Sequence, residues 1–61
     1  MKYEIYDDRS NLLKKAGKEI LGLSKGDAVW VTKDSETAYI VTNKHIDYVN
    51  KIVTVYTEPE E

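Results

Sequence analysis

A glycine-punctuated stretch in the middle of the chain, residues 14–31 (KKAGKEILGLSKGDAVWV), most restricts the fold. The apolar residues around its first half are Leu12, Leu13, Ala16, Ile20 and Leu21. Their near-helical spacing predicts a short helix with one apolar face. Ser10 or Asn11 can cap its start, and Gly22 is expected in the left-handed conformation just past its end. Gly17 inside a helix costs about 1 kcal/mol relative to alanine, so we expect either a close neighbour there or a helix that begins only after it.

A turn and a strand are predicted to follow this helix. Residues 24–27 (SKGD) have the composition of a tight turn. Residues 28–33 then alternate, which places Val29 and Val31 on one face of a strand and Trp30 on the other.

Three other segments have strand character: residues 2–6, 38–42 and 52–57. In the last of these, Val53 and Val55 lie on one face and Tyr56 on the other. Residues 34–37 are expected to form a hairpin loop, whereas residues 45–50 fit a short helical turn or a strand equally well. The pattern predicts an α+β fold that is mainly β: a small, mostly antiparallel sheet or barrel with one short helix.

The small size of the chain makes a self-sufficient core marginal. Sixty-one residues form one domain, predicted at residues 1–57 with an acidic, frayed tail at 58–61. A chain of this length buries only about 60% of the surface that its unfolded form exposes, and no cysteine is present to supply a disulfide. Small chains without such cross-links often gain burial by dimerising, so we expect a homodimer. We also expect a cytoplasmic protein without membrane contact, because no apolar run is long enough for a span.

The sequence offers no convincing catalytic or metal-binding motif. His45 is the one histidine, and catalysis would require a carboxylate such as Asp47 to orient it, so a surface histidine is the simpler interpretation. Asp7 and Asp8 lie in a segment without glycine, which favours a solvated turn over a cation loop. The glycine spacing does not fit a phosphate-binding loop. We therefore predict no catalytic residue, no metal site, no cofactor and no enzymatic activity.

Charge is distributed unevenly along the chain. Residues 1–26 carry six Lys and Arg against four Asp and Glu, a net charge of +2, and residues 27–61 carry three against seven, a net charge of −4. The basic face of the predicted helix region consists of Arg9, Lys14, Lys15 and Lys18. These cations fit either salt-sensitive binding to DNA phosphates or the solvated side of an amphipathic helix.

The aromatic residues of the predicted strands are Trp30, Tyr39 and Tyr56. Base stacking requires exposed aromatic rings flanked by basic residues, but acidic residues such as Asp34, Glu36 and Glu58 lie nearby in the sequence. Packing in a core or a dimer interface is therefore favoured.

The order of these segments resembles a known DNA-binding family. Leu21-Gly22-Leu23, Gly26-Asp27 and the hairpin that follows resemble the swapped-hairpin domain of the AbrB, MazE and SpoVT family, over residues 2–44. Arg9 lies one position from the family's loop arginine, and Lys18 falls where a helix arginine often stands. The resemblance implies a small dimeric transcriptional regulator or antitoxin whose two chains interleave their hairpins into one barrel and contact DNA through the basic residues.

The resemblance also implies which residues are buried and what the end of the chain does. The residues expected to be buried in an interleaved barrel are Leu21, Leu23, Val29, Val31 and Ile40. Residues 45–61 would be an appendage that binds a protein such as a toxin in extended form.

A second hypothesis is a small acidic protein-interaction module, such as a phage or mobile-element inhibitor of a host protein. It rests on the short length and the acidic second half of the chain. The partner would be bound by an exposed strand edge at residues 52–57 or by an aromatic patch that includes Tyr39, Tyr48 or Tyr56. The residues expected to bind it are Tyr48, Ile52 and Tyr56.

Overall fold

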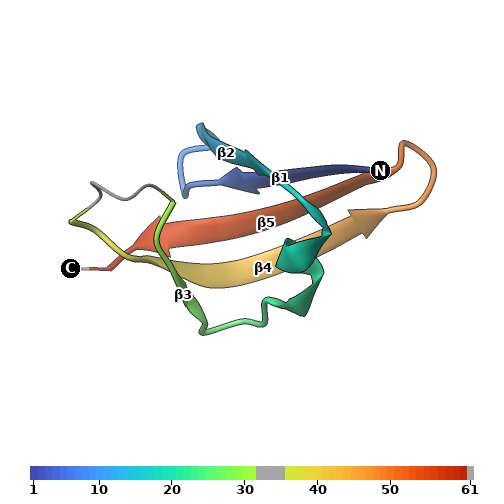
Figure 1. Ribbon diagram of the computed structural model, residues 1–61. Coiled ribbons are helices and arrows are strands. Elements are labelled where there is room, and N and C mark those ends of the chain that lie inside the picture. Colours follow the sequence, from blue (N-terminus) through green and yellow to red (C-terminus); the bar gives the residue numbers. More distant parts are fainter. Residues whose placement is uncertain (32–35, 61) are drawn as a thin grey trace.

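The computed structural model describes residues 1–31 and 36–60 and is mainly β (Figure 1). The strands are β1 (Lys2–Tyr6), β2 (Leu12–Ala16), β3 (Ala28–Val29), β4 (Tyr39–Asp47) and β5 (Ile52–Pro59). A short 3₁₀ helix, η1 (Lys18–Gly22), connects β2 to β3. All five strands belong to one sheet with the order β2-β1-β5-β4-β3. The prediction of a small, mainly β fold is confirmed.

Strand β5 lies in the middle of the sheet, between β1 and β4. It runs parallel to β1, with Ile5 opposite Val55, and antiparallel to β4. Val53 and Val55 point to the covered face and are fully buried. The buried cluster at the centre of the fold consists of Ile5, Ile20, Val41, Val53 and Val55. The strand with the densest run of β-branched residues therefore occupies the position with two neighbours, where such residues pack best.

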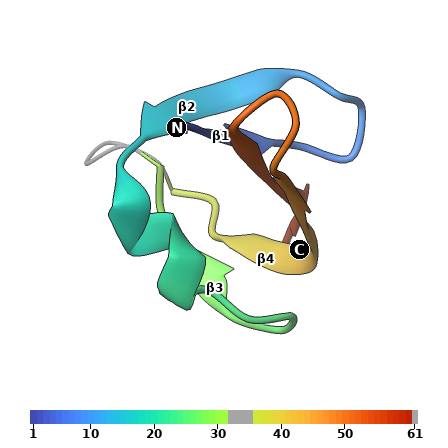
Figure 2. The ribbon, with the colours of Figure 1, turned by 90° about the vertical axis from the view of Figure 1, so that its right-hand side faces the viewer.

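The sheet is curled into a half-barrel, which Figure 2 shows from one end. Register shifts between Ile5 and Tyr6 and between Val41 and Asn43 interrupt the antiparallel ladders. Irregularities of this kind bend a strand and increase its twist. The connection through η1 crosses the open side between β2 at one edge of the sheet and β3 at the other (Figure 2).

The prediction of one helix through residues 12–21 is wrong. Residues 12–16 form strand β2, which pairs with β1 so that Glu4 lies opposite Lys15 and Ile5 opposite Lys14. The helical segment is η1, which begins at Lys18 directly after Gly17. The alternative in which the helix begins only after Gly17 is therefore the one observed. The apolar residues of so short a segment fit a helix and a strand about equally well. The pairing with β1 therefore decides the outcome.

The predicted role of Gly22 is also wrong, whereas the turn after it is confirmed. Gly22 is the last residue of η1 and does not have a positive φ. The left-handed glycine is Gly26, with φ 97°. It occupies the third position of a turn closed by a hydrogen bond from Asp27 N–H to Ser24 O, 3.0 Å long, and that position of a type II turn requires positive φ.

The second half of the chain is more regular than the sequence indicated. Residues 45–47 belong to β4 and residues 48–51 form a turn, so the strand interpretation holds for the start of the ambiguous segment. Strand β5 extends to Pro59, and Glu60 N–H donates to Ala38 O at 2.9 Å. Part of the hairpin loop predicted at residues 34–37 lies outside the described residues.

The core is built within one chain. The strand that the family resemblance treats as an appendage is the central strand of the sheet, so that expectation is wrong. The residues expected to be buried in an interleaved barrel are only partly so: Leu23, Val29, Val31 and Ile40 are half-buried, and Leu21 is exposed. Because β4 pairs with β5 from Tyr39 to Asp47, β5 completes the sheet without a second chain.

Candidate protein-interaction cleft

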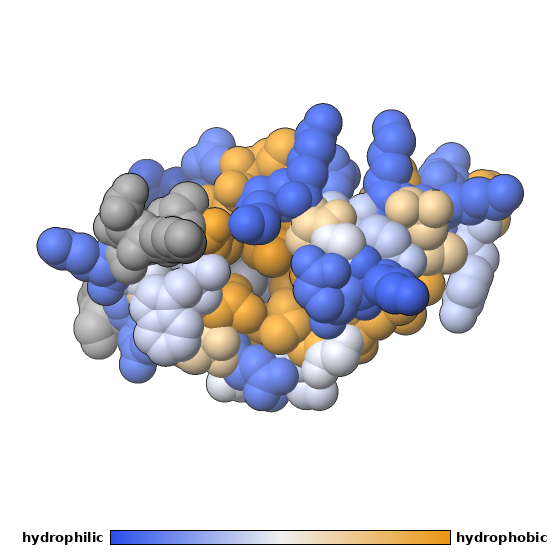
Figure 3. Space-filling view, in the orientation of Figure 1, coloured by the Kyte–Doolittle hydropathy of each residue, from blue (hydrophilic) through white to orange (hydrophobic). Residues whose placement is uncertain are grey.

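A cleft of about 200 Å³ opens on the concave side of the half-barrel. Apolar side chains are visible at its centre in the space-filling view (Figure 3). It is bounded on one side by β1 and β2, at one end by η1, and on the other side by the segment from Leu23 to Val31. We call it the Trp30 cleft; its lining residues are Ile5, Lys14, Ala16, Glu19, Ile20, Leu23, Val29, Trp30 and Val31.

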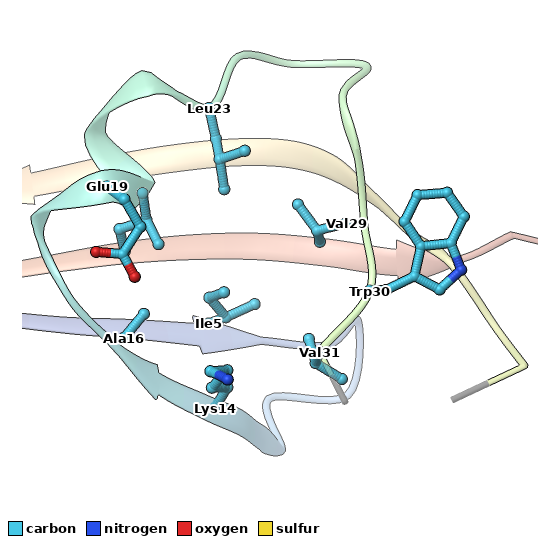
Figure 4. Close-up of a pocket in the computed structure, with 9 residues that line it drawn as sticks. Ile5, Lys14, Ala16, Glu19, Leu23, Val29, Trp30 and Val31 are labelled. Carbon is cyan, nitrogen blue, oxygen red and sulfur yellow. The ribbon is translucent and has the colours of Figure 1, made fainter. Parts of the chain in front are cut away.

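The alternation of β2 determines which of its residues reach the cleft. Successive residues of a strand point to opposite faces, so Lys14 and Ala16 line the cleft and Lys15 does not. Gly17 then ends the strand, and η1 places Ile20 in the core beneath the cleft and Glu19 at its rim. In Figure 4, Lys14, Ala16 and Glu19 lie around the same opening.

The helical turn is fixed to the sheet by Lys44. Its ammonium group on β4 donates hydrogen bonds to Leu21 O at 2.8 Å and to Leu23 O at 3.0 Å. The carbonyl groups at the end of a helix have no partner within the helix, so this lysine supplies one. The end wall of the Trp30 cleft is therefore held against β4 by a charged side chain.

Trp30 projects from the rim of the cleft. Figure 4 shows Val29 and Val31 pointing toward the opening, whereas the Trp30 ring points away from it. Trp30 lies opposite Val29 and Val31, as the alternation predicts, and it is 64% exposed. The expectation that it packs in the core of the chain is therefore wrong. Strand β3 pairs with β4 on one side and forms the edge of the sheet on the other. A large aromatic side chain thus stands beside an open strand edge and an apolar hollow.

The rim of the cleft carries one charge of each sign. Glu19 accepts a hydrogen bond from Gly17 N–H at 3.1 Å. Hydrogen bonds from its own backbone N–H and from that of Gly17, together with the nearby Lys14 ammonium group, hold the pKa of the Glu19 carboxyl below its ordinary value. At neutral pH the rim therefore presents a cation on β2 and an anion on η1.

The four residues predicted to bind DNA do not share one face. Arg9 lies in the β1–β2 loop, where its backbone N–H donates to Asp7 Oδ1 at 2.9 Å. Lys14 faces the cleft, Lys15 faces the other side of the sheet, and Lys18 lies on η1. All four are exposed, but the common helical face on which they were expected is absent because residues 12–16 form a strand.

The three residues predicted to bind a partner are also separated. Tyr48 lies in the β4–β5 turn and is highly exposed. Ile52 and Tyr56 are half-buried on β5, which is the central strand, so the prediction of an exposed strand edge at residues 52–57 is wrong. The Tyr56 ring packs on the outer face of the sheet against Tyr6, at 6.1 Å between ring centroids, and against His45, at 5.0 Å. Cross-strand contacts of this kind stabilise sheets.

The acidic residues considered for chemistry stabilise their own turns. Asp47 accepts hydrogen bonds from Val49 N–H and from both nitrogens of Asn50. Asp7 accepts them from Arg9 N–H and from both nitrogens of Asn11. Within residues 1–31 and 36–60, no three His, Asp or Glu side chains gather in the way that a metal site requires. These carboxylates therefore act as hydrogen-bond acceptors that shape the two hairpins.

Sequence reasoning did not find the cleft. The helix predicted through residues 12–21 contains both Ala16 and Glu19, whereas in the structure Ala16 lies on β2 and Glu19 on η1. The strand order that brings β2 and β3 to face each other across the opening depends on the parallel pairing of β1 with β5. The one local signal was the alternation of Val29, Trp30 and Val31, which correctly placed a large aromatic residue opposite two inward-facing valines.

Comparison with family models, curated proteins and solved structures finds no match for this chain. The AbrB-like resemblance therefore remains a prediction. Among the described residues, no helix has the length and apolar character needed to cross a membrane.

Proposed function

We propose that this chain is a small protein-interaction module and that the Trp30 cleft binds an apolar segment of a protein chain. The observation that carries the proposal is an exposed tryptophan beside an apolar cleft at an unpaired strand edge. Tryptophan is among the residues that contribute most to protein interfaces. An open edge offers backbone groups to which an extended segment can add as a further strand.

The size of the cleft supports a protein side chain as its occupant. Pockets that enclose small-molecule ligands usually have volumes of about 300–1,000 Å³, whereas the Trp30 cleft measures about 200 Å³. Its lining is mainly apolar, and Ile5 and Ile20 at its base are buried. One or two aliphatic or aromatic side chains of a docked segment would fill this space.

A peptide-display selection tests the proposal without a known partner. The chain serves as bait for a library of random 12-residue peptides, and selected peptides are remeasured against two variants. Ala16→Leu places a larger side chain in the cleft, and Lys15→Leu makes a similar change at the neighbouring position on the other face of β2. We expect apolar peptides whose affinity falls at least tenfold with Ala16→Leu and stays within twofold with Lys15→Leu. Peptides that bind both variants equally, or no selected peptides at all, would contradict the proposal.

DNA binding by a dimeric transcriptional regulator or antitoxin is the second candidate. It is favoured by the β1–β2 hairpin, where the side chains of Arg9 and Lys15 are exposed and form no hydrogen bond or ion pair within the described part of the chain. Exposed cations on a two-stranded segment can contact phosphates beside the major groove.

Fluorescence anisotropy with a labelled random-sequence duplex distinguishes this candidate. If DNA is the ligand, binding weakens steeply as salt is raised, and the Arg9→Ala, Lys15→Ala double variant binds at least tenfold more weakly. If the wild-type chain does not bind the duplex at low salt, DNA binding is ruled out. This result does not bear on peptide binding in the Trp30 cleft.

A further inference from the structure

We propose that the chain seated in the Trp30 cleft is a second copy of this chain, related to the first by a twofold axis. This inference rests on the proposed function of the cleft and names its occupant. In such an arrangement the β2 rim of one copy faces the η1 and Trp30 rim of the other. Each copy then gives and receives the same contacts, as a twofold interface requires.

The charges at the rim are self-complementary. Lys14 stands on the β2 side and Glu19 on the η1 side of the same opening (Figure 4). A twofold axis that runs midway between Lys14 and Glu19, perpendicular to the line joining them, places Lys14 of each copy opposite Glu19 of the other. A partner of strongly acidic or basic character would meet one favourable and one unfavourable charge here, whereas a second copy meets two favourable pairs.

The rim also exposes apolar surface that an interface between two copies would bury. Apolar side chains that a dimer could cover are at the rim itself, where Trp30 is 64% exposed and Val29 and Val31 are only half-buried.

The unpaired edge of β3 offers backbone hydrogen-bonding groups to a second copy. Strand β3 has only two residues, and its outer side faces no other strand within the described chain. An open edge beside apolar side chains is a template for pairing with another chain. A second copy that covers Trp30 would shield this edge from other partners.

Charge reversal at Lys14 and Glu19 tests the twofold dimer, because mixing the two variants restores pairing only if the two residues meet across the interface. The Lys14→Glu chain carries two anions at its rim, and the Glu19→Lys chain carries two cations. Each variant alone would oppose like charges in a twofold dimer, so its dimer dissociation constant should rise at least tenfold. A mixture of the two variants pairs anions with cations at both contacts and should form a heterodimer. Native mass spectrometry of the two chains, distinguished by mass, measures this directly, with circular dichroism to check folding.

A pair of neutral variants covers the case in which a charge reversal unfolds the chain. Trp30→Ser removes the exposed ring at the rim and should weaken the dimer at least tenfold. Tyr48→Ser removes a similarly exposed ring from the β4–β5 turn and should leave the dimer unchanged.

The outcomes separate this inference from the proposed function. A wild-type chain that stays monomeric up to millimolar concentration overturns the second-copy proposal. A dimer whose dissociation constant is unchanged by Trp30→Ser and by both charge reversals also overturns it. Two folded variants that fail to form the heterodimer overturn the twofold pairing. In each case, the proposed function is still supported if Ala16→Leu weakens the binding of the selected peptides. If Ala16→Leu also leaves the affinity of the selected peptides unchanged, both proposals fail.

Discussion

Lys44 on β4 donates a 2.8 Å hydrogen bond to the carbonyl oxygen of Leu21 in η1, twenty-three residues away in the sequence. A second bond, to Leu23 O, makes the same ammonium group a bridge between the sheet and the C-terminal end of η1. This bridge holds the only helical segment of the described chain against β4 and so defines the end wall of the Trp30 cleft.

Replacing Lys44 with methionine should lower the free energy of unfolding by about 1–2 kcal/mol, because two backbone carbonyl groups lose a charged donor. Methionine preserves most of the aliphatic stem. Urea unfolding followed by tryptophan fluorescence measures the change. Lys25→Met, in the exposed turn before β3, is the control and should have little effect. Equal stability of the two variants would show that the Lys44 bridge does not stabilise the fold.

Thr57→Val should lower the free energy of unfolding by about 1–2 kcal/mol, since the buried Thr57 hydroxyl donates to Tyr6 O at 2.9 Å. This bond links β5 to the end of β1, where the parallel ladder stops. Thr54→Val is the matched control on the outer face of the same strand, where no side-chain bond is lost. Thermal unfolding of the two variants tests the difference, and a smaller loss for Thr57→Val than for Thr54→Val would be inconsistent with this link.

Lys51→Gly should raise the free energy of unfolding by up to about 1 kcal/mol. Lys51 ends the β4–β5 turn with φ 58°, a left-handed conformation that side chains with a Cβ atom adopt at a cost. Lys51→Ala keeps that atom and should not gain stability, so it isolates the backbone effect. The reverse order of the two variants in denaturant unfolding would argue against strain at this turn.

Stability should fall below about pH 4 because of the two aspartates that shape the hairpins. Hydrogen bonds, chiefly from the Asn11 backbone N–H for Asp7 and from the Asn50 backbone N–H for Asp47, hold both pKa values below the ordinary range. A carboxyl whose pKa is lowered by folding contributes stability that is present above its unfolded pKa of about 3.9 and lost as the pH falls through the folded pKa.

An Asp7→Asn, Asp47→Asn double variant tests this explanation of the acid sensitivity. It should be less stable than the wild type at pH 6 and should lose less stability between pH 5 and pH 2. Thermal midpoints across this range give both quantities. If the double variant has the same pH profile as the wild type, the acid sensitivity has another source.

The sequence was sufficient for the strands with strong local patterns. Residues 2–6 and 52–57 were placed in strands, and the turn at residues 24–27 was found, because alternation and turn composition are local signals. The prediction for residues 12–16 is wrong because Leu12, Leu13 and Ala16 also fit a helix, and only the antiparallel pairing with β1 decides in favour of a strand.

The cleft depends on pairing between strands that are far apart in the sequence, which a local sequence pattern does not predict. Val53 and Val55 lie beside β1 only because β5 returns parallel to it after some fifty residues, and the resulting strand order puts β2 and β3 at opposite edges of the sheet. The alternation places Trp30 opposite Val29 and Val31, but it does not reveal which residues lie across the opening. Ala16 and Glu19 come to line the same cleft only through that long-range pairing.

Quenching of Trp30 fluorescence by acrylamide tests the binding role of the cleft most directly, because Trp30 is the one tryptophan in the chain. The dilute chain should be quenched nearly as readily as a free indole. Quenching should fall at least twofold when a selected peptide is bound or when the chain is concentrated enough to dimerise, and Ala16→Leu should reduce this protection. Equal quenching of Trp30 in the free, peptide-bound and concentrated states would contradict the assignment of this cleft as the binding surface.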